Sequence, residues 1–450
     1  MKIGQFRLGL RSAIALIALL NGVLMTGSTA AQTPTLNNMD RDRGRAMLAV
    51  IKDDIKKNYY DPAYHGIDLE ARFKTADEKI KTATSIGQVF GIIAQVLIDF
   101  EDSHLFFLPP SRTTRTDYGW QMQMFGAKCY VVAVKPGCDA ETKGLKPGDE
   151  IISVDGFGPI RENLWKLRYL YYTLRPRPGM HVSAVSPEGN QKELDVLAKV
   201  RQTKLRVDLT GMDGGNDIQD LMREEENEDR LRSHRYYDWA EGDLFVWKMP
   251  AFDLEDRGVD ELMDKARKRK ALILDLRGNP GGAERTLLRL IGHFTDHDLK
   301  LGDMKRRKET KPMLAKTRGD RIFNGKLVVL IDSNSASSAE IFARAIQLEK
   351  RGTVIGDQSA GAVMRAIHSS HQLGADTVVF YGVSVTDADL VMTDGKSLER
   401  TGVIPDELLL PTADDLAAKR DPVLARAAEL AGFKITPERA GALFPIEWRK

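Results

Sequence analysis

Apolar residues in the first part of the chain recur at the spacing of one helix face. The pattern predicts helical structure from residue 41 to about residue 84, with a break at Asp61-Pro62, and a second helix from Ser85 to Phe100. Ser85 is of the residue type that caps a helix N-terminus. A pair of prolines stops regular structure soon afterwards, so we expect a helical cap over residues 32–112.

The pattern then changes to short strands between about residues 117 and 204. Residues 129–134 form a β-rich run, and residues 144–156 read as a turn, a strand and a turn. We therefore expect a β-rich domain over residues 113–205. A polar, strongly charged stretch follows, and we interpret residues 206–242 as a solvated insert or linker.

Strands and helices alternate in the remainder of the chain. Apolar strands are predicted at 244–247, 271–275 and 327–332, and helices near 258–268 and from Glu284 onward. Unbroken apolar strands that alternate with helices indicate a mostly parallel α/β core. We assign it to residues 243–450, including a C-terminal helical segment, with catalytic loops expected at the carboxyl ends of the strands.

The N-terminal segment has the layout of a secretory signal peptide. Three positive charges precede an apolar stretch at residues 13–25, and small residues follow at 27–31. The apolar stretch is short and is interrupted by Asn21-Gly22, which argues against a spanning helix. We expect residues 1–31 to be removed and the mature protein to be periplasmic or secreted, without stable membrane insertion.

Composition narrows the classes of partner and cofactor. A hydrophobic fraction of 42% and a charged fraction of 29% are those of an ordinary globular protein. The formal charge of +2, without a long basic block, argues against nucleic acid as a partner.

Cys129 and Cys138 could form a local bridge, but two buried thiols fit an extended strand better. His293 and His297 lack a third ligand, so no metal or cofactor is expected.

A serine-rich turn connects the predicted strand 327–332 to the next helix. A serine at such a turn is exposed, and the helix N-terminus favours negative charge that develops beside it. The same turn would also suit a helix N-cap. The local pattern therefore leaves a nucleophile and a cap both open.

Three motifs resemble those of known protein families. Residues 144–156, Gly-Leu-Lys-Pro-Gly-Asp-Glu-Ile-Ile-Ser-Val-Asp-Gly, are similar to bacterial PDZ domains, whereas Asp275 to Gly282 and Ser335-Ala-Ser-Ser-Ala-Glu340 resemble tail-specific (C-terminal processing) and tricorn-like serine peptidases. The order of cap, PDZ domain and α/β core is the same. The resemblance implies a ClpP/crotonase-like core with Ser337 as nucleophile. It also implies an oxyanion hole formed by Gly281, Gly282 and Ser338. The resemblance to PDZ domains implies a peptide-binding loop formed by Gly126, Ala127 and Lys128.

The chain departs from the processing proteases at the base. Their lysine corresponds to Ala362 here, so a Ser/Lys pair at the usual place is excluded. Tricorn-like members use a histidine preceded by serine, together with a downstream glutamate. The resemblance then implies His104 as general base, Ser103 as partner of its ring, and Glu399 as the group that orients Ser103. His368 or His371 is the alternative base.

Two hypotheses follow from these residues. The first is an exported serine endopeptidase that cleaves flexible or unfolded chains through an acyl-enzyme, with a histidine base. The second is a catalytically inactive, PDZ-containing pseudo-peptidase that acts as a peptide-binding or scaffold protein. Both leave a homo-oligomer open.

Overall fold

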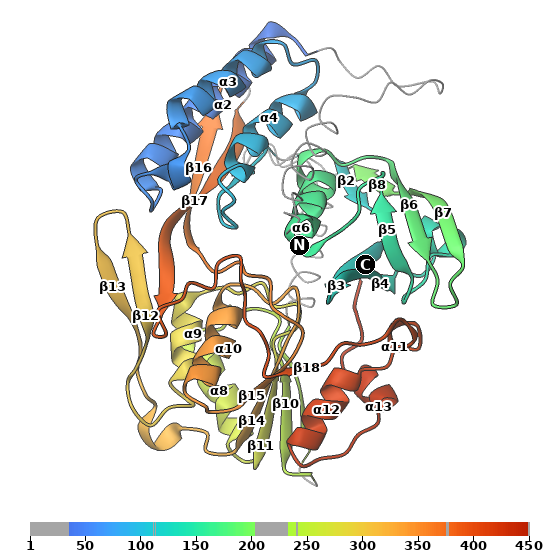
Figure 1. The fold of residues 1–450 in the computed structure, drawn as a ribbon, viewed down its shortest axis with the longest axis vertical. Coiled ribbons are helices and arrows are strands. Elements are labelled where there is room, and N and C mark those ends of the chain that lie inside the picture. Colours follow the sequence, from blue (N-terminus) through green and yellow to red (C-terminus); the bar gives the residue numbers. More distant parts are fainter. Residues whose placement is uncertain are drawn as a thin grey trace, which may run out of the picture.

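The computed structural model describes residues 36–110, 112, 114–202, 233–239, 242–374 and 378–448. They form a helical cap, a β-rich domain and an α/β core (Figure 1). The predicted signal peptide and residues 206–232 of the predicted insert lie outside the described residues. Within the described ranges, no helix combines the length and the apolar character that crossing a membrane would need.

The cap consists of α2 (Asn38–Asn58), α3 (Leu69–Lys81) and α4 (Ile86–Ile98), with a short η1 (Tyr64–Gly66) after α2. Each long helix begins at a side chain that accepts a backbone N–H, and for α4 this is Ser85, as predicted. The helices pack on one end of the ribbon formed by β16 (Arg365–Leu373) and β17 (Val379–Met392) (Figure 1). The cap and the ribbon therefore share one apolar cluster.

The ribbon belongs to an antiparallel sheet that also contains β1 (Phe106–Leu108), β12 (Leu299–Arg306) and β13 (Thr310–Ala315). β17 pairs with β16 and β1 near the cap and with β12 at its other end. One long strand thus connects the cap to the core.

The β-rich domain is a five-stranded antiparallel sheet with flanking helices (Figure 1). Both cysteines are free thiols; Cys129 is buried, and burial raises its pKa to about 12, whereas Cys138 is half-buried. The strands are β3 (Trp120–Phe125), β4 (Lys128–Val134), β5 (Glu150–Val154), β6 (Gly179–Val185) and β7 (Gln191–Leu197), and the other elements are α5 (Asp139–Thr142), α6 (Arg161–Arg168), η2 (Tyr169–Leu174) and the pair β2 (Thr114–Asp117) and β8 (Lys199–Gln202).

The core sheet has the order β18-β15-β14-β11-β10-β9 and is parallel except for β9, in agreement with the predicted mostly parallel core. The apolar clusters place α8, α9 and α10 on one face and α12 and α13 on the other, as Figure 1 shows. The strands are β9 (Arg235–Trp239), β10 (Leu244–Lys248), β11 (Ala271–Asp275), β14 (Lys326–Ile331), β15 (Thr353–Gly356) and β18 (Glu407–Leu408). The helices are α8 (Asp256–Ala266), α9 (Glu284–Ile291), η4 (Gly319–Arg321), α10 (Ser338–Leu348), α11 (Ala413–Ala417), α12 (Pro422–Leu430) and α13 (Pro437–Gly441).

Strand β9 falls inside the range 206–242, where the sequence predicts an insert or linker. It pairs antiparallel with β10, with Tyr237 opposite Val246, and so forms the edge of the core sheet. An edge strand is not buried on all sides, and Tyr236 and Tyr237 are 40% and 36% exposed. The segment therefore does not need the continuous apolar run of an inner strand, which is the pattern that the sequence analysis looked for.

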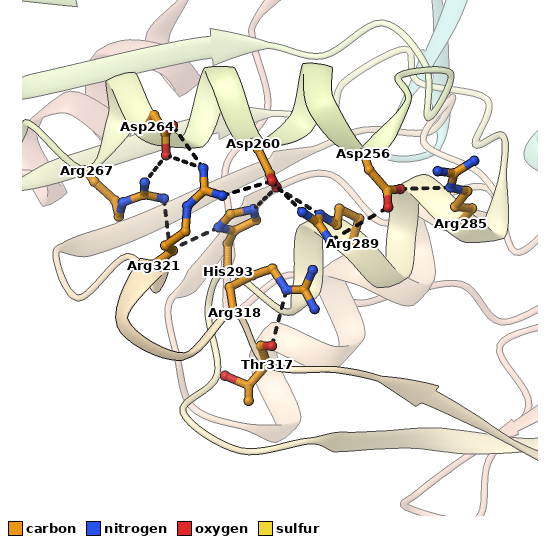
Figure 2. A network of polar contacts seen from close by, with 10 residues as sticks. All are labelled: Asp256, Asp260, Asp264, Arg267, Arg285, Arg289, His293, Thr317, Arg318 and Arg321. Atoms are coloured by element: carbon orange, nitrogen blue, oxygen red, sulfur yellow. Dashed lines mark hydrogen bonds and ion pairs between the residues drawn. The ribbon is translucent and has the colours of Figure 1, made fainter.

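His293 is a structural residue that connects α9 to its neighbours (Figure 2). It is fully buried, and its Nε2 lies 2.9 Å from Oδ1 of Asp260 on α8, while its Nδ1 lies 3.0 Å from the carbonyl oxygen of Arg321. His297 pairs instead with Asp296 on the surface. The two histidines therefore bind different groups.

Candidate active site

Ser337 occupies a strained turn between β14 and α10. It is the N-cap residue of α10 and has φ 54° and ψ −120°, a conformation that residues with a Cβ rarely adopt. The turn is held by Asp332, whose Oδ1 accepts the N–H groups of Asn334 at 3.0 Å and Gly278 at 2.9 Å. Ser337 remains partly exposed. The position thus combines an accessible hydroxyl, a helix N-terminus and backbone strain of the kind found at functional sites.

The glycine motif lies directly against Ser337. Gly281 has φ +95°, and a Cβ added there would lie 2.5 Å from Cβ of Ser337 and 3.0 Å from the backbone nitrogen of Ser338. Only a residue without a side chain allows this approach.

The assignment of Gly281 to the oxyanion hole needs a correction. Its N–H donates to Oδ1 of Asn279 at 2.8 Å, so it is not available to a substrate. The N–H groups of Gly282 and Ser338 have no hydrogen-bond partner in the described part of the chain. The two residues are adjacent, since the Ser338 hydroxyl donates to the carbonyl of Gly282 at 3.0 Å. The free donors beside Ser337 are therefore Gly282 and Ser338.

The structure joins Ser103, His104 and Glu399 in one relay. The two carboxylate oxygens of Glu399 accept the N–H and the hydroxyl of Ser103, each at 3.0 Å. The Ser103 hydroxyl lies 2.7 Å from Nδ1 of His104. Because that hydroxyl donates to Glu399, Nδ1–H donates to the hydroxyl, and Nε2 keeps its lone pair. This is the tautomer that a general base needs.

Asp102 is a site residue that the sequence analysis did not assign. It is 2% exposed, and its Oδ1 accepts the N–H of His104 at 2.9 Å and the hydroxyl of Thr386 at 2.6 Å, while its Oδ2 accepts the hydroxyl of Tyr59 at 3.0 Å. These bonds fix the backbone of His104 between α2 and β17. Its place before Ser103-His104 in the sequence was the only available signal.

Burial sets the protonation of the relay. It lowers the pKa of His104 below its ordinary value of 6.5, although the charge of Asp102 acts in the opposite direction. Burial also raises the pKa of Glu399, against the hydrogen bonds that it accepts. The imidazole is consequently neutral at neutral pH.

The relay and Ser337 meet at residues 362–363. The N–H of Ser337 donates to the carbonyl of Ala362 at 2.8 Å, and the N–H of Val363 donates to Oε2 of Glu399 at 2.9 Å. No hydrogen bond joins His104 to Ser337, both of which lie in the described part of the chain. The structure thus brings the two halves of the site to neighbouring residues without direct contact between base and nucleophile.

The two alternative histidines differ in position. The ring centroid of His368 lies 6.3 Å from that of Phe106, two residues after His104, and the charge of His368 also lowers the pKa of His104. His371 pairs with Asp54 of the cap at 2.6 Å and is committed there.

The predicted peptide-binding loop faces the core. The N–H of Gly126 donates to Oδ2 of Asp357 at 3.0 Å, and its carbonyl accepts from Nε of Arg161 at 2.8 Å. Ala127 is exposed, and Lys128 pairs with Glu150 at 2.8 Å. In this structure the Gly126 amide is therefore occupied by a carboxylate of the chain itself.

Residues 245–409 match the model of Peptidase family S41. The chain is similar to the carboxy-terminal processing protease CtpA of Bacillus subtilis, with 22% identity over 380 residues that cover 80% of this chain and 72% of the relative. It is 27% identical over 320 residues to the tail-specific protease of Haemophilus influenzae, covering 65% of this chain and 41% of that protein.

Among solved structures, that of mature CPAF superposes with a TM-score of 0.62 at 16% identity and covers 84% of this chain and 95% of that chain. At this identity the likeness concerns the fold, which is the mixed α/β architecture predicted from the sequence.

Proposed function

Because residues 245–409 match the model of Peptidase family S41, we propose that the chain is a serine endopeptidase with Ser337 as nucleophile and His104 as general base. The observation that carries the proposal is the relay, in which the Ser103 hydroxyl lies 2.7 Å from Nδ1 of His104 and 3.0 Å from Glu399. A carboxylate that acts through a hydroxyl on the imidazole fixes its tautomer and stabilises its protonated form.

In the proposed reaction, Nε2 of His104 takes the hydroxyl proton of Ser337 while Oγ attacks the carbonyl carbon of the substrate. The N–H groups of Gly282 and Ser338 stabilise the oxyanion of the tetrahedral intermediate. Its collapse breaks the C–N bond, and the amine leaves with the proton from His104. Water then hydrolyses the acyl-enzyme, with His104 again as the base.

Direct transfer requires Nε2 to approach Oγ to about 2.6–3.2 Å. We propose that substrate binding closes this gap. The cap carries His104 and is connected to the core by β17, so a small shift of the cap relative to the core would bring base and nucleophile together.

The proposal also assigns roles to the β-rich domain and to the N-terminal segment. Residues 113–205 would act as a PDZ domain that receives a flexible chain at the Gly126 to Lys128 loop. The antiparallel five-stranded sheet and its flanking helix α6 support this assignment. Residues 1–31 would direct export to the periplasm or the medium, where the substrates would be flexible peptides or unfolded proteins.

Turnover of an unfolded protein substrate tests the proposal. Ser337→Ala and His104→Ala should each abolish cleavage, whereas Ser333→Ala, in the same turn, should retain it. Activity should fall toward acid pH, because the base must be neutral. Full activity in either site variant would remove that residue from the mechanism, and activity confined to alkaline pH would indicate a lysine base.

The pseudo-peptidase remains a second candidate, because Ala362 occupies the lysine position and His104 makes no hydrogen bond with Ser337. A fluorophosphonate reacts only with an activated serine. An unlabelled Ser337 together with saturable peptide binding would favour the binding protein over the peptidase.

A further inference from the structure

Glu340 lies buried directly beneath the nucleophile. It is in the first turn of α10, and its exposed fraction is 0%. Its Oε2 accepts the N–H groups of Ser337 at 3.0 Å and Ala362 at 2.9 Å. Its Oε1 accepts the hydroxyl of Ser359 at 2.6 Å and the N–H of Gly361 at 2.7 Å. One carboxylate therefore binds both the strained turn and the segment 359–362.

All four partners of Glu340 are donors. Three of them are backbone N–H groups, which can only donate, and the fourth is the Ser359 hydroxyl, whose oxygen also accepts the N–H of Val403 at 2.6 Å. Only a group with acceptors on both of its ends satisfies four donors, and an ionised carboxylate is such a group. A carboxamide would direct at least one N–H toward a backbone N–H, and a protonated carboxyl would lose one of the four bonds or reverse the bond with Ser359.

The charged residues of the neighbouring segments bind elsewhere. Asp357 binds Gly126 and Arg161, Asp332 binds the turn at Asn334, and Arg400 pairs with Glu101 at 2.7 Å. Glu399 binds Ser103 and Val363. Within the described residues, Glu340 consequently has hydrogen-bond donors but no cation to stabilise its charge.

The segment held by Glu340 is also the one that connects Ser337 to the relay. Ala362 accepts the N–H of Ser337, and the next residue, Val363, binds Glu399. We infer that Glu340 is a positioning residue that holds Ser337 and residues 359–362 in the arrangement for attack, and that it does so only as a carboxylate. This inference rests on the proposed function of Ser337.

The protonation of Glu340 falls in the working range of pH. Burial raises its pKa to about 7, although its hydrogen bonds act in the opposite direction. Below this pH the added proton breaks one of the four bonds or reverses the bond with Ser359. Both Glu340 and His104 must then lose a proton for activity. A plot of log kcat against pH should therefore rise with a slope approaching two in the acid range.

The variant Glu340→Gln tests the inference. A displacement of about 1 Å at the nucleophile should lower kcat on the order of 100-fold with little change in KM. The acid limb of its pH profile should lose one ionisation and keep that of His104. Glu349→Gln, at the other end of the same helix, is the matched control and should behave as the wild type in both respects.

Hydrogen–deuterium exchange provides a readout that does not depend on turnover. In the wild type, the protection factors of the Gly361 and Ala362 amides should fall at least about tenfold between pH 8 and pH 6 as the carboxylate is neutralised. An unchanged slope of the pH profile in Glu340→Gln, or pH-independent protection in the wild type, would overturn the inference. An inactive wild type that still shows the change in protection would instead contradict only the proposed function.

Discussion

Alanine substitutions at two glycines of one motif separate backbone strain from close approach to the nucleophile. Gly278 and Gly281 both have a positive φ, +72° and +95°. A Cβ at Gly278 would meet no atom of the described residues within 4 Å, whereas a Cβ at Gly281 would lie 2.5 Å from Cβ of Ser337 and 2.9 Å from the carbonyl oxygen of Ala336. The two variants thus differ mainly in contact with the site.

The magnitudes follow from these distances. A side chain in the left-handed region costs about 1–2 kcal/mol at either glycine. Carbon atoms pack at about 3.5 Å or more, so Gly281→Ala must move Ser337 by about 1 Å. A displacement of this size at a reacting atom costs on the order of 100-fold in rate. Gly278→Ala should keep kcat within a few-fold.

The assay is kcat on an unstructured protein substrate, combined with thermal unfolding of each variant. Both variants should lose stability, Gly281→Ala more than Gly278→Ala because of its clash with Ser337 and Ala336, and only Gly281→Ala should lose most of its turnover. Equal activity in folded Gly281→Ala and Gly278→Ala would refute the argument that Gly281 is required by the approach to Ser337.

Three further predictions concern the relay and the buried carboxylates. Ser103→Ala removes the hydroxyl between Glu399 and His104, so kcat should fall by about 100-fold or more at constant KM in steady-state kinetics. Tyr59→Phe leaves Oδ2 of Asp102 without its donor and should lower the free energy of unfolding by about 1–3 kcal/mol in denaturant titrations, with a smaller loss of kcat than in Ser103→Ala. The raised pKa of Glu340, about 7 against an ordinary 4.5, means that the folded state binds this proton more tightly, so the contribution of Glu340 to stability is lost as pH rises from 4.5 to 7. The wild type should show this decline relative to Glu340→Gln, and parallel stability curves would contradict it.

The core could be predicted from sequence because its inner strands are continuous apolar runs. Residues 271–275 and 327–332 stand out for this reason, and the structure has β11 and β14 there. The ribbon of β16 and β17 could not be predicted in the same way. β16 contains His368, His371 and four further polar residues, and its partly exposed pattern resembles a loop.

The site was accessible from sequence only through motifs. Ser103 and Glu399 are 296 residues apart, and no local pattern predicts that they hydrogen-bond. A motif also does not show which way a peptide plane points. The amide of Gly281 was therefore assigned to the oxyanion, although it binds Asn279. The four bonds of Glu340 likewise depend on tertiary packing of the segment 359–362.

The most direct test of the account is the site of fluorophosphonate attachment, determined by mass spectrometry of peptides from the treated protein. We predict one adduct on Ser337 in the wild type, a rate of labelling that falls toward acid pH, and no labelling in His104→Ala. A wild type without an adduct on Ser337, or His104→Ala labelled at the wild-type rate, would contradict the claim that a histidine from the cap activates this serine.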